Sequence, residues 1–233
     1  MKYSKTRKGR FISRINRFTA DIDLDGKVER VHVKNTGRCR ELFVPGAEVV
    51  LEESGNPDRK TAFDLVTVKK EGLGWVNVDS QAPNKAVLEW LRESRDAGEI
   101  FPGITYIKPE YKFGKSRVDF YMEAGEKKYL MEIKGVTLER QGQGYFPDAP
   151  TERGVKHLRE LTGASKEGYD CCLGFVIQME GINTVLPNEE THPEFKTALE
   201  EAAAAGVRII YFGCTVCEDE MRIDRFVDIT GKI

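Results

Sequence analysis

The sequence has no apolar run close to the roughly 20 residues that a membrane-spanning helix needs. Its N-terminus is basic, but it lacks the apolar segment of a secretory signal peptide. These two absences argue against a membrane protein and against secretion. We therefore expect a soluble protein that stays in the cytoplasm.

Cysteine is scarce, and the five cysteines are too irregularly spaced for a disulfide framework. Only Cys214 and Cys217 have the spacing of a metal or redox pair, and a structural zinc site needs a second such pair. Cys171 and Cys172 are adjacent and open an apolar stretch, where free cysteine behaves as a small hydrophobic residue. We therefore expect the thiols to be structural.

The sequence also has no glycine-rich phosphate loop, no dinucleotide-binding fingerprint and no internal repeat. These absences disfavour a nucleotide-dependent metabolic enzyme. A sugar-binding regulator is a further alternative. A titration in which the protein binds sugar, and in which DNA has no effect, would support it.

Charge is plentiful and unevenly distributed along the 233 residues. Residues 1–80 carry 16 Lys and Arg against 12 Asp and Glu, so the excess of acid lies in the remainder. The basic residues near the N-terminus are Lys2, Lys5, Arg7, Lys8, Arg10, Arg14 and Arg17. Such a cluster can contact a polyanion, and a solvated or disordered leader is the alternative interpretation.

Residues 9–80 have the pattern of a small β-barrel, with about five short strands separated by Gly and Pro turns. An OB-like barrel is the first choice and an Src-homology-3-like barrel the alternative. OB barrels commonly bind nucleic acid through basic and aromatic side chains. The basic residues in or beside the expected loops are Arg38, Arg40, Arg59 and Lys60. Phe43 and Trp75 could stack on bases, although one aromatic in a small barrel more often belongs to the core.

From residue 81 onward, helical and strand patterns alternate, which predicts a mixed sheet with helices on both faces. A first helix is expected from residue 85 to about 97, with Glu89 exposed to solvent. Thr151 is the expected N-cap of a second helix. That helix carries Arg153, Lys156 and His157, which could meet a phosphate backbone.

Residues 116–135 predict two strands joined by a turn, and each strand carries one carboxylate among apolar residues. Asp119 lies on the first strand and Glu132 on the second, so a hairpin brings them close together. Lys134 projects from the same face as Glu132, because side chains two apart on a strand share a face. Mg²⁺ prefers oxygen ligands, which gives such buried carboxylates a use.

Several motifs together make the chain resemble the sugar fermentation stimulation protein A family. They are Asn35-Thr-Gly-Arg38, Pro45-Gly46, Asn56-Pro-Asp-Arg-Lys60, Asn84-Lys85, Ser116-Arg-Val-Asp-Phe120, Glu132-Ile-Lys-Gly-Val-Thr-Leu138 and Phe146-Pro-Asp-Ala-Pro-Thr-Glu-Arg-Gly-Val-Lys-His-Leu158. The resemblance implies an OB-like domain over residues 1–80 and a PD-(D/E)xK nuclease-like domain over residues 81–233. It also implies binding of DNA and an association with sugar-utilisation genes. Phosphate contacts by the barrel and the basic N-terminal residues predict that the binding has little sequence specificity.

The same resemblance implies roles for individual residues. Asp119 and Glu132 match the carboxylates that hold Mg²⁺ or Mn²⁺ in nucleases of this fold, and the Ile133 carbonyl falls at a frequent backbone ligand. Lys134 matches the catalytic lysine, whereas Val118 replaces the proline of the motif. The predicted function is thus a metal-dependent nuclease. The alternative is a DNA-binding regulator that uses the nuclease fold as a non-catalytic scaffold.

Overall fold

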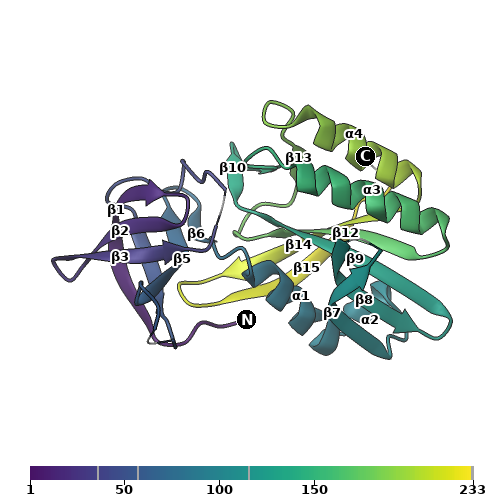
Figure 1. Cartoon of the computed structure of the whole chain (residues 1–233), viewed down its shortest axis with the longest axis horizontal. Coiled ribbons are helices and arrows are strands. Elements are labelled where there is room, and N and C mark those ends of the chain that lie inside the picture. Colours follow the sequence, from purple (N-terminus) through teal and green to yellow (C-terminus); the bar gives the residue numbers. More distant parts are fainter. Residues whose placement is uncertain (36, 57, 115, 232–233) are drawn as a thin grey trace.

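The first domain is a barrel of short strands. The structure is a computed structural model that describes residues 1–35, 37–56, 58–114 and 116–231, and Figure 1 shows its two domains side by side. The strands of the first domain are β1 Thr6–Asn16, β2 Thr19–Leu24, β3 Lys27–Val33, β4 Glu48–Glu53, β5 Phe63–Lys70 and β6 Gly74–Asn77.

The barrel is closed by strands that are distant in sequence. β1 pairs with β2 and β4, β2 pairs with β3, and β4 pairs with β5. A short parallel pairing of β3 with β5, through His32 opposite Asp64, completes the ring. This five-strand order is that of an OB barrel and confirms the first choice over the alternative barrel. Asp25 and Gly26 both have positive φ, as the predicted hairpin turn requires.

Most of the basic N-terminal stretch from Lys2 to Arg17 belongs to strand β1, so it is not a disordered leader, although its basic side chains are mostly exposed to solvent. β1 pairs along one edge with β4 from Thr6 onward. Arg14 uses its guanidinium to donate hydrogen bonds to the carbonyls of Arg17, Asn35 and Gly37, at 2.7 to 2.8 Å. Backbone pairing and this internal bonding fix the segment.

The second domain is built on a six-stranded mixed sheet in the order β15-β14-β12-β9-β8-β7. β12 is parallel to both β9 and β14, and the other pairs are antiparallel. The strands are β7 Tyr106–Phe113, β8 Ser116–Ala124, β9 Lys127–Val136, β12 Asp170–Ile177, β14 Arg208–Val216 and β15 Met221–Asp228. A small second sheet contains β10 Leu138–Arg140, β11 Gln143–Phe146 and β13 Val185–Pro187.

Helices cover both faces of the six-stranded sheet, as predicted. In Figure 1 the pair α3 and α4 lies on one face, and α1 and α2 lie on the other. The helices are α1 Ala82–Glu93, α2 Ala97–Ile100, α3 Glu152–Lys166 and α4 Pro193–Ala204. Thr151 is the N-cap of α3, since its hydroxyl accepts a hydrogen bond from the Gly154 amide at 3.1 Å. α1 ends a few residues before the predicted boundary near residue 97.

The burial of four of the cysteines agrees with the prediction that the thiols have a structural role. Cys39, Cys171, Cys172 and Cys214 are buried, Cys217 is exposed, and all five are free. Burial raises the pKa of the Cys171 thiol to about 12, so this thiol is unreactive at neutral pH. None of the described helices is both long and apolar enough to cross a membrane.

Candidate active site

The β8–β9 hairpin brings the two predicted carboxylates together. The antiparallel ladder runs as far as Phe120 opposite Met131, which sets Asp119 across from Glu132. Beyond this pair the ladder gives way to a side-chain contact, in which Asp119 Oδ2 accepts a hydrogen bond from the Ile133 amide at 2.7 Å. The predicted proximity of Asp119 and Glu132 is therefore confirmed.

The Ile133 backbone opens toward the same place. In an antiparallel ladder the N–H and C=O of one residue point to the same neighbouring strand. Because the Ile133 amide points to Asp119, its carbonyl oxygen lies on that edge of β9 as well. Regular strand geometry thus puts the Ile133 carbonyl on the edge of β9 that faces Asp119.

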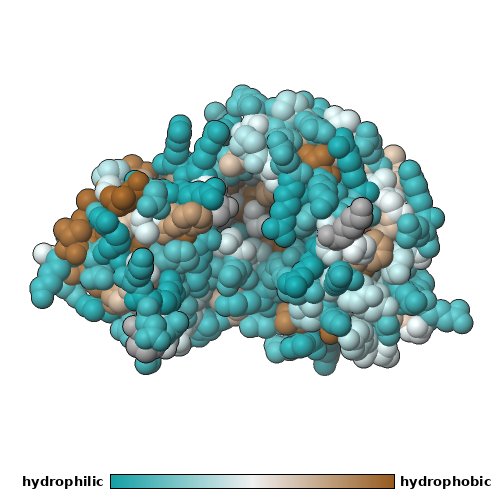
Figure 2. Space-filling view, in the orientation of Figure 1, coloured by the Kyte–Doolittle hydropathy of each residue, from teal (hydrophilic) through white to brown (hydrophobic). Residues whose placement is uncertain are grey.

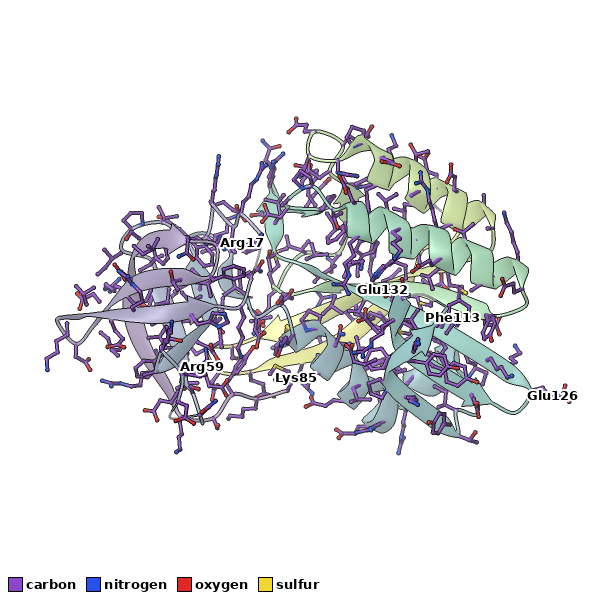
Figure 3. All side chains as sticks on the ribbon, viewed as in Figure 1. Arg17, Arg59, Lys85, Phe113, Glu126 and Glu132 are labelled. Atoms are coloured by element: carbon purple, nitrogen blue, oxygen red, sulfur yellow. The ribbon has the colours of Figure 1, made fainter. Side chains whose placement is uncertain are left out.

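Glu132 is the more enclosed carboxylate, and its residue is only 3% exposed. It lies between the sheet and α3 (Figure 3). Lys134 Nζ donates a hydrogen bond to Glu132 Oε1 at 2.6 Å, and His157 Nδ1, from α3, contacts the same oxygen. Glu132 Oε1 therefore has two nitrogen partners.

Opposing influences separate the acidities of the two carboxyl groups. Burial, reinforced by the neighbouring charge of Glu132, raises the pKa of Asp119. Burial acts in the same direction on Glu132, but the hydrogen bond from His157 and the charge of Lys134 outweigh it and lower the pKa of Glu132. Pairs of carboxyl groups with divergent acidity are typical of catalytic and metal-binding sites.

Asn84 supports the site from the opposite face of the sheet. Its amide nitrogen, on the first turn of α1, donates a hydrogen bond to Asp119 Oδ1 at 2.8 Å. Both oxygens of Asp119 are therefore held. Sequence patterns singled out Asn84 only as part of a family motif, because nothing local to it indicates a contact with a strand that follows 35 residues later.

The donor atoms at the site suit a hard divalent cation. Among the described residues, no group of three or more His, Cys, Asp or Glu side chains is arranged to hold a metal alone. Mg²⁺ commonly binds one or two carboxylates and keeps several waters or substrate oxygens as its other ligands. Asp119, Glu132 and the Ile133 carbonyl fit that description, and Lys134 is the adjacent cation.

The three residues of α3 that were predicted to contact phosphate occupy different environments. Arg153 and Lys156 are exposed, as a contact with phosphate requires. His157 is 8% exposed and has both ring nitrogens engaged, with Nδ1 against Glu132 and Nε2 accepting from Arg153 Nε at 3.3 Å. A phosphate contact by His157 would have to displace one of these partners.

The four basic residues of the barrel that were predicted to bind nucleic acid lie in different places. Arg38 and Arg40 are exposed and line a groove of about 300 Å³ together with Arg140 from the second domain. Arg59 instead forms a two-pronged ion pair with Asp64, at 2.7 and 2.9 Å, on a side of the barrel away from Glu132 (Figure 3). Lys60, the neighbour of Arg59, is exposed.

Glu89, Phe43 and Trp75 all have structural surroundings. Glu89 forms an ion pair with the N-terminal nitrogen of Met1 at 2.5 Å, and this partner is not part of the carboxylate site. Phe43 is buried and stacks on Phe11, so it belongs to the core. Trp75 is partly buried beneath Lys69.

Comparisons with known proteins cover both domains. Residues 12–78 match the SfsA N-terminal OB domain, and residues 81–220 match the sugar fermentation stimulation protein RE domain. Sugar fermentation stimulation protein homologues from Clostridium beijerinckii and Desulfitobacterium hafniense are 50% and 49% identical, each over 98% of this chain and at least 98% of their own length.

The fold is also similar to a solved structure, that of Pyrococcus furiosus SfsA in complex with Ca²⁺. The TM-score is 0.87 at 24% identity, with 97% of this chain and 96% of that chain covered. Taken with the family matches over both domains, these relatives show that the chain belongs to the sugar fermentation stimulation protein A family.

Proposed function

We propose that this protein binds nucleic acid and hydrolyses its phosphodiester bonds with the help of a divalent cation. The observation that carries the proposal is the convergence of Asp119, Glu132 and Lys134 at the open end of the β8–β9 hairpin. Two neighbouring carboxylates repel each other, and among the described residues Lys134 forms an ion pair with Glu132 whereas none does so with Asp119, so a bound cation would complete the charge balance.

Different residues of the site would have different roles in the reaction. Asp119, Glu132 and the Ile133 carbonyl would hold Mg²⁺ or Mn²⁺, and a cation bound there would polarise the phosphate and lower the pKa of a bound water. Lys134 would orient or deprotonate the attacking water, or offset charge that develops on the phosphate. Asn84 and His157 would keep the two carboxylates in place.

Nucleic acid would be held mainly through its phosphates. Arg153 and Lys156 lie on the same helix as His157, and Arg38 and Arg40 line the groove between the domains. These exposed cations fit a sequence-independent contact with a DNA backbone. The structure of the P. furiosus relative is a complex with Ca²⁺, a cation that also prefers oxygen ligands, and this supports a cation site in the family.

One observation favours a second candidate, a nucleic-acid-binding regulator that cuts nothing. Glu132 already has Lys134 and His157 as partners, so its charge is compensated without a metal. In such a protein the nuclease-like domain would act as a scaffold for DNA binding near sugar-utilisation genes.

The test uses purified full-length protein on labelled single-stranded and double-stranded DNA, with Mg²⁺, Mn²⁺ or EDTA. It reads binding by gel shift and cleavage on a denaturing gel. Glu132→Gln should abolish metal-dependent cleavage and keep binding. The matched control is Glu89→Gln, which removes a carboxylate from α1 and should cut as the wild type does.

Two results would contradict the nuclease. Salt-sensitive binding without cleavage under either metal would favour the regulator. Cleavage that persists in Glu132→Gln would show that the cutting does not come from this site.

A further inference from the structure

A pocket of about 250 Å³ opens between the two domains. The surface in Figure 2 is hollowed between the barrel and the second domain. The residues of the pocket that matter here are Asn35, Ser80, Gly135, Tyr145, Asp148 and Gln178. They come from the loop after β3, the linker before α1, the end of β9, β11, the loop before α3 and the end of β12, so neither domain forms the pocket alone.

Gln178 places a fixed hydrogen-bond acceptor in this pocket. Its residue is only 1% exposed, and Nε2 donates to the carbonyl and side-chain oxygens of Asn77, both at 3.0 Å, and to the Asp79 carbonyl at 3.2 Å. A reversed amide would set its oxygen against three oxygens, so the orientation is determined. Among the described residues, none donates a hydrogen bond to Gln178 Oε1.

Gly135 makes room for that acceptor. A Cβ at this position would lie 2.2 Å from Gln178 Oε1 and 2.9 Å from Pro83 Cγ, distances that no side chain could accept without displacing its neighbours. Gly135 follows Glu132 by three residues on β9, roughly 10 Å along the strand. Pro83 directly precedes Asn84, which holds Asp119. Gly135, which lines the pocket, is therefore three residues along β9 from Glu132.

Other groups around the pocket suit a planar, nitrogen-rich ligand. Asp148 is fixed by the Cys39 amide, which donates to its Oδ2 at 2.9 Å. Asn35 Oδ1 accepts from the Gly37 amide at 2.7 Å, which leaves the Asn35 NH₂ group as a donor. Tyr145 also lines the pocket, and the Arg140 guanidinium lies over its aromatic ring, 5.5 Å from the ring centroid. Fixed acceptors, an amide donor and an aromatic ring together are typical of nucleobase recognition.

We propose that this pocket receives one unpaired nucleobase of a single-stranded nucleic acid whose backbone passes the Asp119–Glu132 pair. The inference rests on the proposed function and narrows its substrate. A base inside a duplex is stacked and paired, so it cannot enter a concave pocket between two domains without leaving the stack. The preferred substrate is therefore a single strand or an unpaired end, of DNA or RNA.

The test measures binding by fluorescence anisotropy in EDTA, so that no cleavage is needed. The probes are a single strand of about 12 nucleotides, as DNA and as RNA, and an abasic sugar-phosphate strand of the same length and charge. We expect the wild type to bind the base-containing strand about tenfold more tightly than the abasic strand. Tyr145→Leu should remove most of that preference and leave the affinity for the abasic strand unchanged.

The matched control is Tyr106→Leu, which changes a half-exposed tyrosine on the edge strand β7, outside the pocket, and should keep the preference. Equal affinity of the wild type for the base-containing and the abasic strand would contradict base binding in the pocket, but not the binding of nucleic acid. Full preference in a folded Tyr145→Leu variant would also overturn it. Failure to bind any strand would instead overturn the proposed function itself. The DNA and RNA arms show which sugar the site accepts.

Discussion

Asp119 and Ile133 are joined by a hydrogen bond that replaces a rung of the β8–β9 ladder. The Asp119 carboxylate, rather than a β8 carbonyl, accepts from the Ile133 amide at 2.7 Å. This substitution ends the regular pairing of the two strands and turns the Ile133 backbone toward the carboxylates. A local defect in the sheet thus creates the candidate active site.

The hydrogen bond between Asn84 and Asp119 leads to a first prediction. Asn84→Ala removes the only side-chain donor that the described residues offer to Asp119 Oδ1. We expect the affinity for Mg²⁺ to fall roughly tenfold or more, because a carboxylate that loses one of its two orienting hydrogen bonds is a poorer ligand. Titration calorimetry with Mg²⁺ measures this. Lys85→Ala, at the neighbouring position, should bind Mg²⁺ as the wild type does.

His157 leads to a second prediction, on the acidity of Glu132. The hydrogen bond from His157 is the main influence that lowers the pKa of Glu132 against the effect of burial. His157→Leu should therefore raise that pKa. A carboxyl group whose pKa is lower in the folded state than in the unfolded state stabilises the fold at pH values above its unfolded-state pKa. This stabilisation disappears as the pH falls, so the His157→Leu variant should also lose less stability on acidification.

Carboxyl ¹³C shifts of Glu132, followed by NMR over a pH titration, measure the midpoint directly. His32→Leu is the control, because His32 contacts Asp64 in the barrel instead. An unchanged Glu132 midpoint in His157→Leu would show that the histidine does not set its acidity.

Arg38 and Arg40 lead to a third prediction, on the salt dependence of binding. Both are exposed in the groove between the domains. For each phosphate that a variant no longer neutralises, the slope of log K against log salt should become shallower by roughly 0.7 to 0.9. Anisotropy at several salt concentrations tests the double alanine variant. Arg30→Ala is the control, since Arg30 is paired with Asp21 at 2.7 Å on the barrel. An unchanged slope in the double variant would show that neither Arg38 nor Arg40 contacts phosphate.

Asp64 leads to a fourth prediction, on stability against pH. Although burial opposes ionisation, the hydrogen bonds from Arg59 and His32 and the charge of Lys34 lower the pKa of Asp64 from 3.8 to about 2. At about 1.4 kcal/mol per pKa unit, the ionised group contributes on the order of 2 kcal/mol at neutral pH. That contribution is complete above about pH 4 and disappears as pH falls toward 2.

Denaturant unfolding at several pH values tests this. Asp64→Asn should be less stable than the wild type at pH 7, with a difference that shrinks steadily in acid. Asp21→Asn, at an exposed ion pair with Arg30, should change stability much less. A difference that stays constant with pH would contradict the assignment.

Local patterns in the sequence determined the elements of this protein. Period-two alternation around Asp119 and Glu132, with a turn between them, specified the hairpin and the proximity of the carboxylates. Asp25-Gly26 specified a barrel hairpin, and Thr151 specified the start of α3. The predictions succeeded there because strand alternation, turn chemistry and helix capping depend on neighbours only a few residues away.

Tertiary packing decided which side chains complete the site. Asn84 and His157 reach the carboxylates from helices on opposite faces of the sheet, and Gln178 reaches Gly135 from the end of another strand. Sequence patterns placed His157 on a basic helix face and predicted that it contacts phosphate, whereas the packing of α3 turns it to Glu132. Such contacts depend on how elements distant in sequence pack together, and the residues next to each contacting side chain do not predict that packing.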